Sequence, residues 1–195
     1  YEAKQMRDGP KKMLALDGGG IRGALSLEVL AALERKLRER LGSPTLVLGD
    51  WFDYIGGTST GAIIAAGLAT GMPVDELRTK YASLGTRVFS KRFLPLRLTS
   101  LYRNAPLETE LETFFGSKRT LGDSELRSLL LIVLHNTATD SPWPLSNCTA
   151  AKYNRADRYL VSPPDRNLDI PLAPLVRGST AAPFYFSPQE LTVGS

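Results

Sequence analysis

A short turn between two apolar runs constrains the fold of this chain more than any other feature. The run ending at Gly57 is typical of a buried strand, and Ala62–Ala69, apolar on nearly every side, is typical of a buried helix. Only Gly57-Thr58-Ser59-Thr60-Gly61 separates them. So short a connection leads the strand directly into the helix, and its small residues permit a strained backbone. The pattern therefore predicts a strand–turn–helix unit within an α/β domain.

Further apolar patterns extend this alternation along the chain. The runs Met13–Leu16 and Leu129–Leu134 predict a strand that ends in a tight loop and a central strand. Helices are predicted over about 24–41, from Pro73 onward, over Pro106–Phe115 and over Leu172–Ala182. The stretch over 140–166 is predicted to be loop with one or two short strands. Alternating strands and helices predict a single domain over 1–195, with a mostly parallel sheet and helices on both faces.

The predicted helix over about 24–41 has an amphipathic pattern. Large apolar residues recur at every fourth position, and two further leucines widen the stripe. The members of this stripe are Leu25, Val29, Leu30, Leu33, Leu37 and Leu41. We expect the stripe to face the core.

The composition excludes several classes of protein. The net charge of +4 is too small and too dispersed to indicate nucleic-acid binding. The lone cysteine, Cys148, excludes an internal disulfide and favours a reducing, cytoplasmic compartment; a cysteine-poor secreted protein is the alternative. The lone histidine, His135, argues against a zinc site; we expect a hydrogen-bonded structural residue there, and neither a metal nor an organic cofactor. The longest apolar run, Ala62–Ala69, falls far short of the about 20 residues of a membrane span.

The serine of the short turn has the position of a nucleophile. A Gly-x-Ser-x-Gly motif between a strand and a helix lifts its serine, here Ser59, out of the sheet. The helix N-terminus behind it directs amide donors and the positive end of the dipole toward a developing oxyanion. The motif also occurs by chance, so by itself it leaves an ordinary glycine-rich turn as the alternative.

A second glycine motif, Asp17-Gly18-Gly19-Gly20-Ile21-Arg22-Gly23, follows the first predicted strand. It matches the Gly-x-Gly-x-x-Gly of dinucleotide-binding folds, which needs an acidic residue ending a second strand; Leu48-Gly49-Asp50 is the first candidate. Alternatively, the bare N–H groups of consecutive glycines form an oxyanion hole, with the charge of Arg22 nearby. The two glycine motifs together favour a serine acyl hydrolase, and a nucleotide-binding module is the alternative.

Three segments in this order resemble the patatin-like phospholipases: Asp17–Gly23, Phe52–Gly61 and Arg177–Phe186. The resemblance implies a three-layer α/β fold, with a mostly parallel central sheet and helices on both faces. It implies a lipid acyl hydrolase of the phospholipase A type that uses a Ser-Asp dyad and forms an acyl-enzyme. The implied site consists of the nucleophile Ser59, the oxyanion-hole residues Gly19, Gly20, Arg22 and Thr60, and the motif glycines Gly18, Gly23, Gly57 and Gly61.

This chain departs from the family pattern at the general base. The family's catalytic aspartate follows the segment that ends here at Phe186, whereas no aspartate follows Asp169. We therefore expect that the chain is truncated or incompletely recorded at its C-terminus and, as it stands, hydrolyses esters poorly. A catalytically inactive lipid-binding or regulatory relative is the alternative.

The residues from Arg78 to Arg103 include seven basic side chains and no acidic one, interleaved with leucines and aromatics. This pattern suits docking on anionic lipid headgroups, with a phospholipid or other lipid ester as substrate at a peripheral membrane surface. The alternatives are an ordinary solvated cap and a pocket for an anionic activator.

Overall fold

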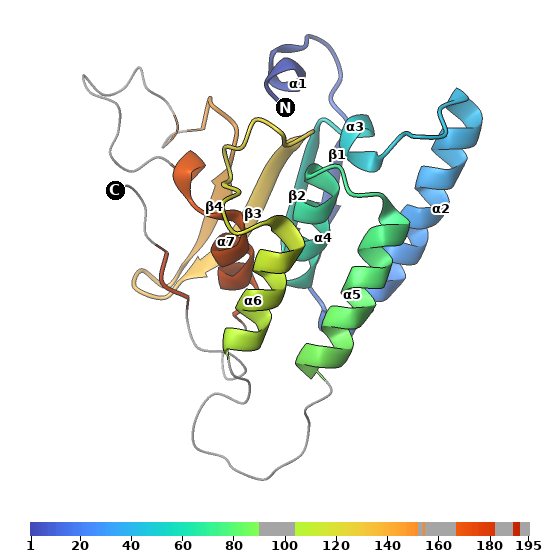
Figure 1. Ribbon diagram of the computed structural model, residues 1–195. Helices are drawn as coiled ribbons and strands as arrows, with labels where there is room; N and C mark the ends of the chain where they lie inside the picture. Colours follow the sequence, from blue (N-terminus) through green and yellow to red (C-terminus); the bar gives the residue numbers. More distant parts are fainter. Residues whose placement is uncertain (90–103, 152–153, 155–166, 182–188, 192–195) are drawn as a thin grey trace.

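A computed structural model describes residues 1–89, 104–151, 154, 167–181 and 189–191 and contains a four-stranded sheet (Figure 1). Its strands are ordered β1 (Met13–Leu16), β2 (Tyr54–Thr58), β3 (Leu129–Asn136) and β4 (Ser141–Ser146). β1, β2 and β3 are parallel, and β4 pairs with β3 in the antiparallel sense. The predicted α/β class, the mostly parallel sheet and the interior position of β3 are confirmed.

Two short helices of the described residues were not predicted, and the other five follow the predicted order with shifted ends. The described helices are α1 (Glu2–Met6), α2 (Gly23–Leu41), α3 (Leu48–Trp51), α4 (Thr60–Ala69), α5 (Val74–Phe89), α6 (Asn104–Phe115) and α7 (Leu172–Ser179), with 3-10 turns η1 (Gly20–Arg22) and η3 (Asn167–Asp169). α7 ends at Ser179, short of the predicted end at Ala182, which lies outside the described residues. None of the described helices is both long enough and apolar enough to span a membrane.

α4 and α7 pack on the same face of the sheet. α4 contacts β1, β2 and β3, and α7 contacts β3 (Figure 1). Gly57 meets α4 and Leu134 meets α7, and the β2–β3 register places these two residues on one face. The core lies between this face and the helices; its largest sheet residues are Ile55, Leu130, Ile132 and Leu145.

The opposite face of the sheet is more open. Met13 is 68% exposed, Ala15 is exposed, and Leu131 and Val133 are half-buried. The described residues therefore supply a helix layer on one face of the sheet, and helices on the other face stay a prediction.

The buried side of α2 matches the predicted stripe only in part: Leu30 is buried, and Leu33 and Leu37 pack against the core. Leu25 and Val29 are 71% and 70% exposed, and the core-facing residues are Leu27, Leu30, Ala31 and Glu34. The reason is geometric: four residues turn a helix through about 400°, so a strict every-fourth row drifts by about 40° per step. α2 packs mainly on α5, and a row that alternates steps of three and four residues follows that contact.

Glu34 joins α2 to the helices beside it. Its buried carboxylate accepts the N–H groups of Leu48 and Val74, both at 3.2 Å, and pairs with Arg38 at 2.6 Å. Burial raises the pKa of Glu34. Because Val74 is the first residue of α5, the hydrogen bond from Val74 to Glu34 fixes the start of this helix, which further along contacts the glycine loop. Leu48 begins α3, so the candidate strand end at Leu48-Gly49-Asp50 is wrong: these residues are helical.

Candidate active site

Ser59 occupies a strained turn between β2 and α4. Its backbone has φ 53° and ψ −127°, a combination that L-residues rarely adopt and that costs about 1–3 kcal/mol. Its carbonyl oxygen accepts the Ala62 N–H at 2.9 Å, so the helix begins at once. The side chain is half-buried. The turn therefore keeps a serine hydroxyl at the amino end of a buried helix, where amide donors gather.

The two glycines that flank this turn are required by close backbone packing. A Cβ atom on Gly57 would come within 3.0 Å of the Gly61 carbonyl oxygen, closer than real Cβ atoms approach. A Cβ atom on Gly61 would come equally close to the carbonyl oxygen of Leu16, the last residue of β1. The turn, α4 and the end of β1 therefore meet backbone to backbone.

The glycine loop lies directly beside Ser59. A Cβ atom on Gly18 would lie 2.8 Å from Ser59 Cβ and 3.5 Å from Ser59 Oγ. β1 and β2 are parallel neighbours, so their carboxyl ends meet at one edge of the sheet and bring the two motifs together. The loop that could bind a nucleotide therefore faces a serine hydroxyl.

The outer part of the loop is open. Gly20 has φ 57°, and a Cβ atom there would meet nothing within 4 Å. Gly19 is exposed, and its nearest neighbours are the side-chain atoms of Arg22, the first of them at 3.5 Å. Arg22 is itself exposed at the start of α2. Thr60, by contrast, is the first residue of α4 and only 4% exposed.

Tyr81 holds the loop from α5, and sequence reasoning missed it. Its hydroxyl donates to the Gly20 carbonyl oxygen at 2.6 Å, and Gly23 has to be glycine because the same hydroxyl occupies the place of a Cβ atom. Burial raises the pKa of Tyr81. The phenol therefore stays protonated and donating near neutral pH. A single tyrosine in an amphipathic helix forms no sequence motif, so the sequence alone could not identify Tyr81 as part of the site.

Ser179 is the second residue that sequence reasoning left without a role. It ends α7, and its hydroxyl accepts the Ser59 backbone N–H at 2.8 Å. The only indication in the sequence was its place within the third family-like segment.

His135 does not belong to the site formed by the Ser59 turn and the glycine loop. Its Nε2 is 3.0 Å from Asp140 Oδ1 across the β3–β4 turn, and both side chains are largely exposed. The expected hydrogen-bonded structural role is confirmed. Within the described ranges, no three His, Cys, Asp or Glu side chains gather as a metal site would require.

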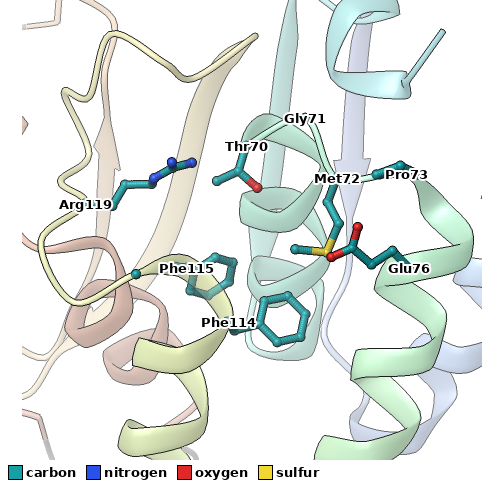
Figure 2. Close-up of a pocket in the computed structure, with 9 residues that line it drawn as sticks. Thr70, Gly71, Met72, Pro73, Glu76, Phe114, Phe115 and Arg119 are labelled. Carbon is teal, nitrogen blue, oxygen red and sulfur yellow. The ribbon is translucent and has the colours of Figure 1, made fainter. Parts of the chain in front are cut away.

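A separate cavity of about 380 Å³ opens at the far end of α4 (Figure 2). Arg119 and Thr70 point toward one another across it, above the ring of Phe115. Its lining residues are Thr70, Gly71, Met72, Pro73, Glu76, Phe114, Phe115, Gly116 and Arg119. The ten residues of α4 separate it from Ser59 by about 15 Å. The cavity is therefore not the space in front of the serine.

Comparisons with known proteins agree with this geometry. A family model described as "Patatin-like phospholipase" matches residues 14–194. A "cGAMP-activated phospholipase" of Escherichia coli (strain TW11681) is 31% identical over 182 residues, which cover 91% of this chain and 48% of that protein. An "Intracellular phospholipase A2" of Caenorhabditis elegans is 33% identical over 178 residues, which cover 91% of this chain and 15% of that protein. The chain thus spans about half the length of the first of these relatives and less of the second.

A solved structure shares the fold. The crystal structure of VipD from Legionella pneumophila matches with a TM-score of 0.53 and 14% sequence identity, over 95% of this chain and 46% of that chain. Two glycine motifs that meet at one sheet edge, a family match over nearly the whole chain and this shared fold lead to one assignment. The chain belongs to the patatin-like phospholipase family.

Proposed function

We propose that this chain forms the catalytic part of a lipid acyl hydrolase of the phospholipase A type, with Ser59 as its nucleophile. The single observation that carries the proposal is the strained Ser59 turn with the glycine loop packed against it. The sharp turn directs the Ser59 hydroxyl away from the sheet, and the glycine loop adds backbone amides beside this hydroxyl. A nucleotide-binding module would need the loop alone and has no use for the serine turn.

The proposed reaction proceeds in two steps through an acyl-enzyme. Ser59 Oγ gives its proton to a general base and attacks the ester carbonyl carbon, and the carbonyl oxygen becomes an oxyanion. The tetrahedral intermediate then collapses, and the departing lysophospholipid oxygen takes the proton back from the base. Water, deprotonated by the same base, next attacks the acyl-serine; the bond to Ser59 Oγ breaks, Oγ takes the proton back from the base, and a fatty acid leaves.

We assign the oxyanion hole to the backbone N–H groups of Gly19, Gly20 and Thr60. Two features support this: Gly18 places the loop against Ser59, and Thr60 begins α4, where helix amides have no intrahelical acceptor. The exposed guanidinium of Arg22 adds positive charge beside the loop. The family resemblance implies an aspartate as the general base, in the sequence after the segment that ends at Phe186.

The test of this function is covalent labelling of the full-length protein. A fluorophosphonate probe should modify Ser59, as identified by peptide mass spectrometry, and Ser59→Ala should abolish both labelling and hydrolysis of a short-chain ester. Ser117→Ala, at an exposed serine after α6, is the control and should change neither. Labelling that persists unchanged in Ser59→Ala would reject the nucleophile, and an unlabelled wild-type protein would support the inactive relative.

We also propose that the basic segment from Arg78 to Arg103 docks the protein, as a cytoplasmic enzyme, on anionic membrane surfaces. Two of its cations are already paired with acids from outside the segment: Arg78 with Glu28 and Asp75, and Lys80 with Glu76 at 3.0 Å. The attraction to lipid must therefore come from the later basic residues, which lie outside the described residues or have undescribed side chains.

Replacing two of these later residues tests the docking proposal. Lys91→Glu with Arg92→Glu should weaken binding to phosphatidylserine vesicles by tenfold or more, because each basic residue near such a surface contributes on the order of 1 kcal/mol. The loss should be larger at low salt. Hydrolysis of a soluble ester should stay at the parental rate. Unchanged vesicle binding would support the solvated-cap reading, and an equal loss of soluble-ester hydrolysis would show that the segment shapes the active site.

A further inference from the structure

We propose that Ser179 is a positioning residue for the nucleophile: its hydroxyl anchors the backbone N–H of Ser59 and so holds the strained turn in its reactive conformation. The proposal rests on the function assigned above to Ser59. It concerns a residue on α7, far from the turn in sequence, that touches the nucleophile's backbone and not the reacting atoms.

The hydrogen bonds of the Ser179 hydroxyl have fixed donors and acceptors. The Ser59 N–H donates to Ser179 Oγ at 2.8 Å, and Ser179 Oγ donates to the Val133 carbonyl oxygen at 2.6 Å. A hydroxyl has one proton and two lone pairs, and an N–H can only donate, so the Ser179 proton must point at Val133. The hydroxyl therefore cannot rotate away without leaving two polar groups unpaired.

These two hydrogen bonds take the place of a missing backbone hydrogen bond between β2 and β3. Thr58 and Val133 are the last register pair of β2 and β3. In a parallel ladder, the next N–H on β2, that of Ser59, would bond directly to the Val133 carbonyl. The chain instead turns sharply at Ser59 to begin α4, and the Ser179 hydroxyl bridges the gap that this turn opens. β2 can therefore leave the sheet within one residue.

The anchor is rigid because α7 is packed into the core. Leu172, Leu175 and Val176 are completely buried, and α7 contacts β3, α4 and α6. The Ser59 peptide is thus held between a sheet and a buried helix. If the anchor were absent, the peptide could rotate to relieve its unusual φ and ψ, and Oγ would swing away from the line of attack. A displacement of about 1 Å at a reacting atom can lower a rate by about 100-fold.

Thr180 offers a matched control. It follows Ser179, is 6% exposed, and its hydroxyl donates to the Arg177 carbonyl oxygen at 2.8 Å within the same helix end. Thr180→Val removes a buried hydroxyl and its hydrogen bond, as Ser179→Ala does, and leaves the Ser59 N–H untouched. A difference between the two variants therefore measures positioning and not general stability.

The experiment compares Ser179→Ala, Ser179→Thr and Thr180→Val in the full-length protein. Ser179→Ala should lower kcat for a short-chain ester and the rate constant of fluorophosphonate labelling by about 10- to 100-fold, with KM unchanged. Ser179→Thr keeps the hydroxyl and should recover most of the rate. Thr180→Val should lower the melting temperature comparably and leave kcat unchanged. Should Ser179→Ala fail to fold, Ser179→Cys, with a weakly hydrogen-bonding sulfur, takes its place.

A second readout separates this inference from the proposed function. Hydrogen exchange at the Ser59 amide should accelerate at least tenfold in Ser179→Ala and not in Thr180→Val, whether or not the protein hydrolyses esters. Unaltered exchange, or a kcat in Ser179→Ala equal to that of Thr180→Val, overturns the positioning role. Failure of the wild-type protein to label at Ser59 overturns the proposed function alone.

Discussion

The two glycine motifs of this protein meet at one edge of the sheet, yet two glycines of the turn and two glycines of the loop are needed for opposite reasons. Gly57 and Gly61 stand where backbone presses on backbone, and a methyl group at either would collide with a carbonyl oxygen. Gly19 and Gly20 stand in the open, where a methyl group would meet an exposed side chain or nothing at all. The first pair therefore serves the packing of the fold, and the second pair serves access to the backbone amides.

The difference extends to what holds each motif in place. The serine turn is held by the strand, by α4 and by Ser179, all of them in the core. The outer part of the loop is held by Tyr81, whose hydroxyl donates to the Gly20 carbonyl oxygen, and its inner end packs on Ser59 at Gly18. The Ser59 turn is thus packed more tightly than the outer part of the loop. Changes in the turn should act on stability, and changes in the loop should act on the rate.

The largest effect is expected for Gly61→Ala. The new methyl group has to displace the end of β1, so the free energy of unfolding should fall by about 3 kcal/mol or more, and the melting temperature by about 10 °C. Gly85→Ala is the control, because this glycine lies in α5 with nothing near its Cβ position. It should be neutral or more stable by about 0.5–1 kcal/mol. Thermal unfolding followed by circular dichroism decides between them, and equal melting temperatures would refute the packing argument.

The next effect is expected for Gly19→Val, and it concerns catalysis. The loop has room for the side chain, so stability should change by less than about 1 kcal/mol. The branched side chain should nevertheless displace an oxyanion donor, and loss of one such donor lowers kcat by about 100- to 1000-fold. Ala24→Val adds similar bulk at an exposed position of α2 and should leave kcat unchanged. A folded Gly19→Val protein with normal turnover would assign the loop another role.

The smallest effect is expected for Tyr81→Phe. The variant loses the hydrogen bond to Gly20, which should lower kcat by about tenfold and the free energy of unfolding by about 1 kcal/mol. Tyr54→Phe removes a comparable bond, 2.7 Å to Ser146 Oγ, at the other end of β2. It should cost similar stability and leave kcat unchanged. If the two variants lose activity equally, Tyr81 does not position the loop.

Local patterns predicted much of this fold. The strand before Gly57, the buried helix after it and the central strand all appear near their predicted positions, because long apolar runs and glycine boundaries act within a few residues. The buried side of α2 was predicted only in part, since Leu30 is buried but Leu25 and Val29 face outward. Which side of a helix is buried depends on the helix packed against it, and no pattern inside α2 identifies α5 as that neighbour.

The sequence by itself determined the strand–turn–helix unit, with Ser59 in its turn, and the glycine loop after β1. Only the tertiary structure decided that Gly18 touches Ser59, that Tyr81 donates to Gly20 and that Ser179 bridges Ser59 to Val133. The physical reason is the distance along the chain over which each interaction acts. Backbone propensity and hydrophobic periodicity act between near neighbours in the chain, whereas hydrogen bonds such as those of Tyr81 and Ser179 join residues that meet only when the sheet and its helices pack.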